Sequence, residues 1–197
     1  VYGLAENSVG LTFPTVGRGP RFDRIDAEQL ARTGAAEITS ADDAISVPSC
    51  GYPISGHQLR IVDEGGRELP DRRQGRLQFQ GPSASSGYLH NAEATKALFD
   101  GDWLNSGDLG YSVEGEIYIT GRVKDLIIRG GRNIHPVEIE AALSGLEGLR
   151  SGGIAVFGSP DPASATERLI VMAETRRRGD EAHTALEREI NARATDI

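Results

Sequence analysis

Residues that build disulfides and metal clusters are scarce in this chain of 197 residues. Cys50 is the single cysteine, so the chain can form no internal disulfide and carries no thiolate cluster for zinc. The four histidines, His57, His90, His135 and His183, never fall three or four residues apart, so no helix could present a histidine pair to a metal. A catalytic metal would therefore be held by carboxylates and substrate oxygens.

Excess basic charge and long apolar runs are also missing. Lys and Arg number 21 against 29 Asp and Glu, and the net charge of -8 argues against nucleic acid as the main partner, because phosphate binding needs a basic face. A cofactor that carries phosphate could still bind locally. No apolar run approaches the roughly 20 residues that span a bilayer, and no leader-like segment is present. The sequence predicts a cytoplasmic protein without a membrane span.

Hydrophobic and polar residues alternate in three short segments in the middle of the chain. The segments "HQLRIVD", "GRLQFQG" and "GEIYIT" begin at His57, Gly75 and Gly115. Alternation with a period of two, bounded by glycine, is typical of half-buried antiparallel strands. The spacing predicts a barrel-like β subdomain, with a short helix after the capping residue Asn91.

Helical spacing replaces this alternation after Asp125. Pro136 stands where a helix would begin, and apolar residues then recur at helical spacing from Ile139 to Leu146. Two apolar runs and a second helical pattern follow. The C-terminal part is therefore predicted to be an α/β unit distinct from the β subdomain.

Several polar residues beside glycines are candidates for chemistry, and each also has an ordinary structural explanation. Asp108 in "NSGDLG" could close a turn by bonding its own backbone, and Glu6 could lie at a helix N-terminus. Arg122 could be a solvated strand end, and Lys124 and Asp125 an exposed linker pair. Taken one at a time, these residues establish no function.

Four segments in a fixed order carry more information. They are "YGLAE" (2–6), "GYPISGHQLRIVD" (51–63), "GRLQFQGPSASSGYLHNAEATKALFDGDWLNSGDLGY" (75–111) and "GRVKDLIIRGGRNIHPVEIE" (121–140). Their order and spacing resemble the core motifs of the adenylate-forming superfamily, and this resemblance covers nearly the whole chain. That superfamily comprises acyl-CoA synthetases, fatty acyl-AMP ligases, nonribosomal adenylation domains and luciferases.

The resemblance implies a mixed α+β fold in three parts. Residues 1–50 would be the end of the large adenylation domain with a connecting region, and residues 51–124 its β-barrel-like subdomain. Residues 125–197 would be a truncated, mobile C-terminal α/β domain. Because the chain opens at Val1 without a methionine and stops as a helix finishes, we expect a piece of a longer protein.

The resemblance also implies roles for individual residues. Asp108 matches the acid that accepts the ribose hydroxyls of ATP, and Arg122 matches the arginine that touches the same ribose. Tyr2 matches the aromatic residue beside adenine, with Gly3 next to it in the nucleotide site. Glu6 matches the catalytic acid that binds Mg²⁺ on the ATP phosphates, in keeping with the preference of hard cations for oxygen.

Hinge and acceptor positions follow from the same match. Lys124 and Asp125 correspond to the hinge about which the small domain swings between two half-reactions. Gly130 and Gly131 correspond to a loop of the second half-reaction, where small residues would let a thin pantetheine arm pass. A plain hairpin turn explains these two glycines equally well.

The implied reaction is activation of a carboxylic acid, a fatty acid above all, as an acyl-adenylate that is then captured by a thiol. The segment "SCGYPISGHQLRIVD" looks most like fatty acyl-AMP ligases, which load acyl carrier proteins of polyketide and lipopeptide assembly through phosphopantetheine. An acyl-CoA synthetase that uses CoA, and a non-catalytic nucleotide-binding or carrier-docking module, are the alternatives. The family's phosphate loop and adenylating lysine do not occur in the chain, so we expect these residues alone not to turn over.

Overall fold

The computed structural model of the chain describes residues 1–42, 44–129, 132–161 and 166–195. The chain divides into two compact units, Val1–Lys124 and Asp125–Ile197. The first unit contains both the predicted connecting region and the predicted β subdomain. Each unit has its own hydrophobic core and is described by itself.

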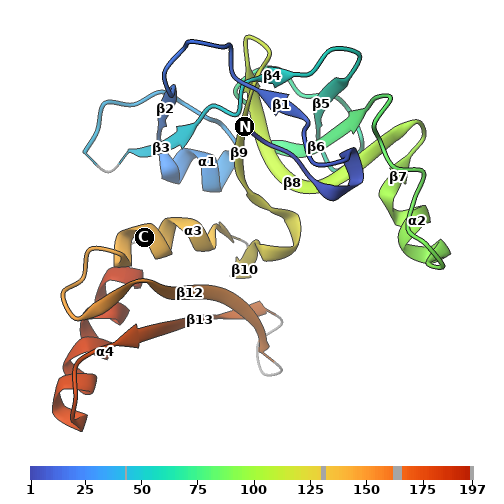
Figure 1. The fold of residues 1–197 in the computed structure, drawn as a ribbon. Coiled ribbons are helices and arrows are strands. Elements are labelled where there is room, and N and C mark those ends of the chain that lie inside the picture. Colours follow the sequence, from blue (N-terminus) through green and yellow to red (C-terminus); the bar gives the residue numbers. More distant parts are fainter. Residues whose placement is uncertain (43, 130–131, 162–165, 196–197) are drawn as a thin grey trace. The chain divides into compact units, whose positions relative to one another are not determined.

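An antiparallel five-stranded sheet is the centre of the first unit (Figure 1). Its strands are β5 (Gln58–Val62), β6 (Gly75–Gln80), β8 (Trp103–Val113), β7 (Phe99–Asp100) and β9 (Glu116–Arg122). The long strand β8 pairs with β6, β7 and β9, and its register shifts against both β6 and β9. Such irregularities increase strand twist. The sheet curls into a half-barrel, which confirms the barrel-like prediction.

The prediction that the strands are half-buried is wrong for β9. Glu116, Ile117, Tyr118 and Thr120 are all buried, so both faces of this strand are covered. The cover comes from the antiparallel pair β2 (Phe22–Ile25) and β3 (Ile45–Pro48) together with helix α1 (Ala27–Thr33) between them in the sequence. Polar side chains in an alternating strand predict a solvent-facing side, even where other polar groups bury them in the folded chain.

The core beneath this cover joins the N-terminal third of the chain to the sheet. Ile25, Leu30 and Val47 pack around Tyr111 and Tyr118, whose rings stack with centroids 5.1 Å apart. Helix α1 ends at Gly34, which adopts a positive φ of 69° that suits glycine.

Short elements near the N-terminus pack on the other side of the sheet. They are the 3-10 turn η1 (Ala5–Asn7) and the paired strands β1 (Thr12–Phe13) and β4 (Tyr52–Pro53). Helix α2 (Ala92–Leu98) begins after Asn91, whose side chain accepts a hydrogen bond from the Ala94 amide at 3.0 Å, as predicted. Leu11, Phe79, Leu98 and Leu104 form the core here.

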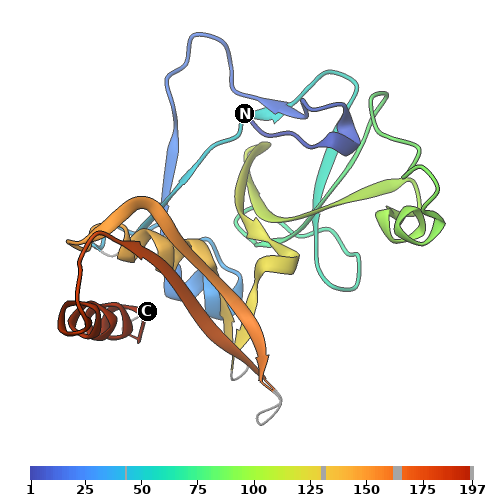
Figure 2. The same cartoon turned by 60° about the horizontal axis from the view of Figure 1, so that its bottom comes forward.

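Two helices and a long β-hairpin build the second unit. Its elements are β10 (Ile127–Arg129), β11 (Arg132–Ile134), α3 (Pro136–Leu143), β12 (Leu149–Asp161), β13 (Thr166–Thr175) and α4 (Asp180–Thr195). Figure 2 shows α4, in dark red, beside the β12–β13 hairpin. The predicted helical face is confirmed, because Ile139 and Leu143 lie in the core with Val156, Leu186 and Ile190. This is the α/β unit expected after Asp125.

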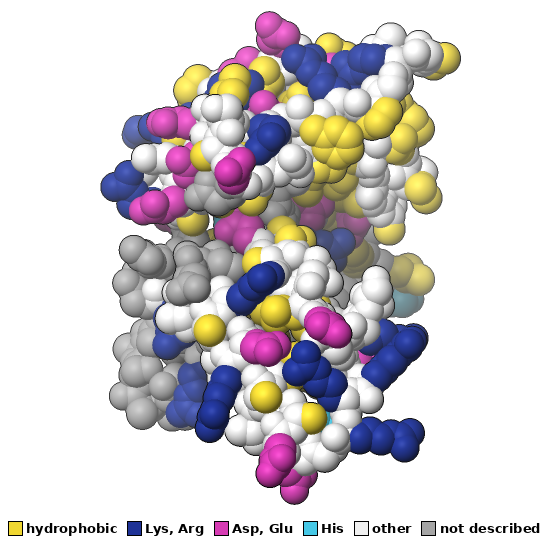
Figure 3. Space-filling view, turned by 90° about the vertical axis from the view of Figure 1, so that its left-hand side faces the viewer, with side chains coloured by type: hydrophobic (Ala, Val, Ile, Leu, Met, Phe, Trp, Pro, Cys, Tyr) yellow, Lys and Arg dark blue, Asp and Glu magenta, His cyan; other side chains and the backbone are white. Residues whose placement is uncertain are grey.

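The surface carries charge of both signs. On the face shown in Figure 3, acidic and basic side chains lie among one another on both units. Within the described ranges, no helix has the length and apolar character needed to cross a membrane.

Candidate functional site

Asp108 lies inside strand β8, where the sequence suggested a turn. Gly107 before it has a φ of +79°, and the strand pairing shifts by one residue immediately after Leu109. The Ser106 hydroxyl accepts a hydrogen bond from the Asp108 amide at 3.0 Å and donates to the Leu77 carbonyl at 2.9 Å. The irregular backbone thus fixes the carboxylate of a residue whose surface is only 6% exposed. Asp108 does not use that carboxylate to bond its own backbone.

Tyr2 and Arg122 meet this carboxylate from two different segments. The Tyr2 hydroxyl donates to Asp108 Oδ2 at 2.5 Å, and the Arg122 Nε lies 3.2 Å from Oδ1. Arg122 is opposite Asp108 in the β8–β9 register. Burial, helped by the bond to Asp108, raises the pKa of the Tyr2 phenol well above its usual value, so the hydroxyl stays a donor. The structure therefore brings three of the predicted site residues together.

The segment 2–6 is held in a tight loop by Gly3. A Cβ atom on Gly3 would lie 1.5 Å from the Val9 carbonyl oxygen, so any other residue would push the loop open. The Tyr2 amide donates to the Thr12 carbonyl at 3.2 Å, and the Leu11 amide donates to the Tyr2 carbonyl at 3.1 Å. Gly3 thus has a packing role that places its neighbour Tyr2.

Glu6 lies in the 3-10 turn η1, four residues after Tyr2. The Tyr88 hydroxyl donates to Glu6 Oε1 at 2.6 Å, and the Ser85 amide donates to the Glu6 carbonyl at 2.7 Å. Among the described residues, no other side chain bonds to the Glu6 carboxylate, so its Oε2 atom is available to a ligand. Across all the residues that the structure describes, no group of three or more His, Cys, Asp or Glu side chains is placed to hold a metal ion by itself.

The other predicted residues lie at or beyond the unit boundary. Lys124 and Asp125 belong to the exposed 3-10 turn η2 (Val123–Asp125), which spans the boundary between the units. Gly130 and Gly131 lie outside the described residues. The hinge and acceptor roles of these four residues stay predictions.

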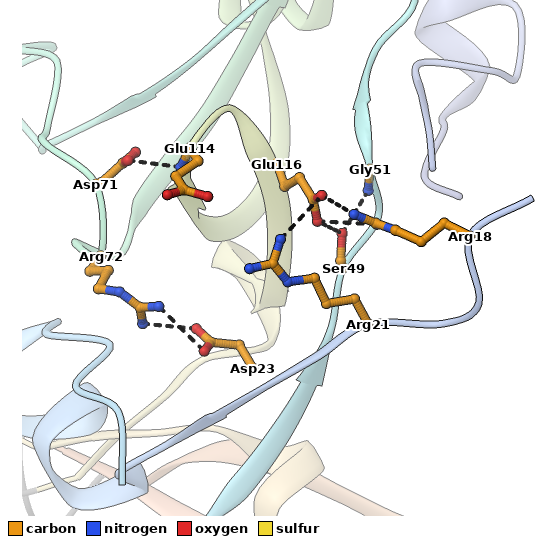
Figure 4. Close-up of polar contacts among 9 residues, drawn as sticks. All are labelled: Arg18, Arg21, Asp23, Ser49, Gly51, Asp71, Arg72, Glu114 and Glu116. Atoms are coloured by element: carbon orange, nitrogen blue, oxygen red, sulfur yellow. Dashed lines mark hydrogen bonds and ion pairs between the residues drawn. The ribbon is translucent and has the colours of Figure 1, made fainter. Parts of the chain in front are cut away.

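Sequence reasoning missed a second buried carboxylate, Glu116 (Figure 4). Its side chain is fully buried and forms an ion pair with Arg18, whose Nη2 lies 3.2 Å from Oε2. Arg21 Nη1 lies 3.6 Å from Oε1, and the Ser49 hydroxyl donates to Oε2 at 2.5 Å. Arg18 above all, with Ser49 and Tyr52, lowers the pKa of Glu116 to about 2. We call this set of five residues the Glu116 cluster.

The Glu116 cluster fastens the segment that precedes β2 to the start of β9. A second ion pair nearby joins Asp23 to Arg72, with Nη1 at 2.9 Å from Oδ2 (Figure 4). The Tyr111 hydroxyl donates to the same oxygen at 2.9 Å. A glycine-flanked glutamate in an alternating strand gives no sequence signal of burial. The only hint is the arginine-rich stretch "GRGPRFDR" (17–24), which supplies its partners.

Residues 1–89 match the AMP-binding enzyme family. A solved structure from a study of fatty acyl-adenylate ligases of E. coli and L. pneumophila superposes with a TM-score of 0.88 at 31% identity, over 99% of this chain and 35% of that one. The chain belongs to the adenylate-forming enzymes. Its curled half-barrel and mixed α+β units match their fold.

Two curated relatives place the chain within this superfamily. A long-chain fatty acid–AMP ligase of Mycobacterium tuberculosis is 34% identical over 199 residues, which cover 94% of this chain and 33% of the relative. A 2-succinylbenzoate–CoA ligase of Enterococcus faecalis is 39% identical over 121 residues, covering 61% of this chain and 24% of the relative. The chain spans about one third of the length of the curated relatives it matches.

Proposed function

We propose that this chain is part of a longer ATP-dependent ligase that activates a fatty or other carboxylic acid as an acyl-adenylate. The observation that carries the proposal is the buried Asp108 carboxylate between Tyr2 and Arg122. A carboxylate offers about four lone-pair sites, and these two donors use one site on each oxygen. One further site on each oxygen matches the two hydroxyls of a ribose, which is the diol of a nucleotide.

Arg122 and Glu6 extend the site toward the phosphates. The Arg122 side chain is 59% exposed, so its guanidinium can contact both Asp108 and a ligand. Glu6 offers one carboxylate oxygen without a protein partner among the described residues, which suits a hard cation such as Mg²⁺ as a single protein ligand. The other ligands would be phosphate oxygens and water, and the bound cation would neutralise charge on the phosphates.

The chemistry that follows is displacement at phosphorus. A carboxylate oxygen of the acid forms a bond to the α-phosphorus of ATP, and the bond from that phosphorus to the bridging oxygen breaks, so pyrophosphate leaves with its electron pair. Asp108 and Arg122 fix the ribose, Tyr2 orients Asp108, and Glu6 aligns the phosphates. Positioning and electrostatics supply the rate, since no residue of this chain forms a covalent bond.

The second half-reaction passes the acyl group to a thiol. We propose that the acceptor is the phosphopantetheine of a carrier protein and that the second unit turns about Lys124 and Asp125 to admit it past Gly130 and Gly131. The similarity to a long-chain fatty acid–AMP ligase across both units supports a fatty acid as the activated substrate. The polyketide or lipopeptide setting and a cytoplasmic location belong to the same proposal.

CoA is the second candidate acceptor. The similarity to a CoA ligase of Enterococcus faecalis favours it. Acyl transfer by the longer protein to CoA and to a phosphopantetheinylated carrier protein, measured side by side, separates the two acceptors. Labelled acyl group on the carrier alone supports our proposal, and labelled CoA alone overturns it.

The adenylating activity is tested by trapping the acyl-adenylate with hydroxylamine. The longer protein, incubated with ATP, Mg²⁺ and a panel of fatty acids, should form hydroxamate. Its Asp108→Ala variant should form hydroxamate at least about a hundredfold more slowly. Asp71→Ala is the matched control, since its carboxylate bonds only Ser112 and the Glu114 amide at the surface. No hydroxamate with any acid would favour a non-catalytic binding module.

A further inference from the structure

The loop 81–88 bonds to the turn that carries Glu6 at four points. The Ser85 amide donates to the Glu6 carbonyl, and the Tyr88 hydroxyl donates to the Glu6 carboxylate. The Ser83 hydroxyl donates to Asn7 Oδ1 at 3.2 Å, and the Ser8 hydroxyl donates to the Ser83 carbonyl at 3.2 Å. One loop therefore holds the backbone of residues 6–8 and also the carboxylate itself.

Tyr88 engages one oxygen of Glu6 and leaves the other open. Its hydroxyl donates to Oε1 at 2.6 Å. Because Tyr88 already holds one oxygen, the Glu6 carboxylate has little rotational freedom left to lose when a cation binds to the other oxygen.

A second line of contacts reaches the same turn from the start of β5. Asn7 is fully buried and its Nδ2 donates to the Gly10 carbonyl at 2.7 Å, which turns its Oδ1 toward Ser83. The Ser83 hydroxyl lies between two partners, 3.2 Å from that Oδ1 and 2.7 Å from Nε2 of His57. The contacts thus run from His57 through Ser83 to Asn7.

Two glycines make room for these contacts. A Cβ atom on Gly81 would lie 2.1 Å from Cδ2 of His57, and one on Gly87 would lie 2.4 Å from Cγ2 of Thr95. Gly87 also has a φ of +132°, which disfavours other residues. Thr95 in turn accepts a hydrogen bond from the Tyr88 amide at 2.9 Å. The loop is therefore packed closely at both ends.

We propose that the loop 81–88 is the positioning device for Glu6. In this arrangement Tyr88 orients the carboxylate for a divalent cation, and His57 holds the turn through Ser83 and Asn7. The inference rests on the proposed role of Glu6 as a cation ligand. Tyr88, Ser83 and His57 are positioning residues, because they act through Glu6 and Asn7 and touch no reacting atom.

Binding of Mn²⁺ tests the role of Tyr88 without measuring turnover. The longer protein is saturated with the α,β-methylene analogue of ATP, and free Mn²⁺ is followed by its electron paramagnetic resonance signal. Tyr88→Phe removes one oxygen and should raise the Mn²⁺ dissociation constant about three- to tenfold, the order expected for one hydrogen bond to a charged group at a partly exposed site. Affinity for the analogue in the presence of EDTA should not change.

Tyr52→Phe is the matched control for this change. Tyr52 is 39% exposed against 42% for Tyr88, and it hydrogen-bonds a glutamate that is not in the proposed nucleotide site, Glu116. Its loss should leave the Mn²⁺ dissociation constant unchanged. An equal rise in both variants would overturn the proposal, since it would mean a general loosening of the unit.

Hydrogen exchange tests the second line of contacts. The Asn7, Ser8 and Val9 amides bond to carbonyls within the turn, so their exchange reports how well it is held. Ser83→Ala, His57→Ala and Gly81→Ala should each speed exchange of these three amides, while His57→Gln, which keeps a polar side chain that can bond to Ser83, should restore much of the protection. Unchanged exchange in all three variants would contradict the role of His57.

Glu6→Gln separates this inference from the proposed function. If Glu6→Gln leaves Mn²⁺ binding unchanged, Glu6 is not a cation ligand and the assignment on which the inference rests is wrong. If Glu6→Gln weakens Mn²⁺ binding strongly and Tyr88→Phe does not, the assigned role of Glu6 stands and the positioning role of Tyr88 is refuted.

Discussion

Asp108 and Glu116 are two buried carboxylates on neighbouring strands of one sheet. They have the same kinds of partner but differ in how much hydrogen-bonding capacity is left for a ligand. Each meets an arginine and a tyrosine, and each is less than a tenth exposed. Glu116 is engaged by two arginines, a serine and a tyrosine. Asp108 has two side-chain partners, one of them an arginine that is mostly exposed.

The difference lies in how many acceptor sites remain. Around Glu116 the donors fill the lone pairs of the carboxylate, so the group can only hold segments of the chain together. Around Asp108 the donors orient the carboxylate and leave part of its capacity unused. A buried carboxylate therefore indicates a binding site when its hydrogen-bonding capacity is incompletely used, and a structural tie when it is full.

The largest expected difference is in stability. Glu116→Gln leaves Arg18 and Arg21 beside a neutral side chain and should lower the free energy of unfolding by about 3 kcal/mol, as for other buried pairs that lose one charge. Asp108→Asn should cost less than about 1 kcal/mol, because Arg122 returns to water. Urea unfolding followed by Trp103, the single tryptophan and a residue of β8, measures both. Equal losses would erase the distinction between the two carboxylates.

Acid should sharpen the same contrast. The pKa of Glu116 in the folded chain is about 2, below its ordinary value of 4.5, because of Arg18, Ser49 and Tyr52. Its contribution to stability is therefore fully present above pH 4.5 and is lost as the pH falls from 4.5 toward 2. The difference in unfolding free energy between the wild type and Glu116→Gln should shrink over that interval. A difference that is constant with pH would contradict the assigned pKa.

Tyr2→Phe gives a smaller effect at the other carboxylate. Removing the hydroxyl leaves Asp108 Oδ2 without its donor and should weaken ATP binding by the longer protein about three- to tenfold. Tyr111→Phe is the matched control, because Tyr111 is also buried and donates to an aspartate, Asp23, at 2.9 Å. That variant should lose stability and keep its ATP affinity. Calorimetric titration with ATP at saturating Mg²⁺ compares the two.

The sequence predicted much of the fold and only part of the site. Period-two alternation located β5, β6 and β9, and helical spacing located α2, α3 and α4. These signals are local, since they depend on which side of one element is apolar. The resemblance to adenylate-forming enzymes named Tyr2, Asp108 and Arg122, and the structure brings their side chains together.

Contacts between distant segments could not be predicted in this way. Arg18 and Glu116 are 98 residues apart, and Tyr88 and Glu6 are 82 residues apart. Neither pair leaves a periodic pattern, because each depends on how loops close over the sheet. The same holds for β9, whose polar face is covered by the paired strands β2 and β3, so that alternation alone gave the wrong degree of burial.

Pairing a change in the ligand with a change in the protein tests the nucleotide role of Asp108 most directly. Dissociation constants of ATP and 3′-deoxy-ATP are measured for the longer protein and for its Asp108→Ala variant, which keeps no side-chain acceptor. We predict that loss of the ribose 3′-hydroxyl weakens binding about tenfold in the wild type and has almost no effect in the variant. The hydroxyl and the Asp108 carboxylate share one hydrogen bond, and either change alone removes it. Equal losses in both proteins would show that Asp108 does not bind the ribose.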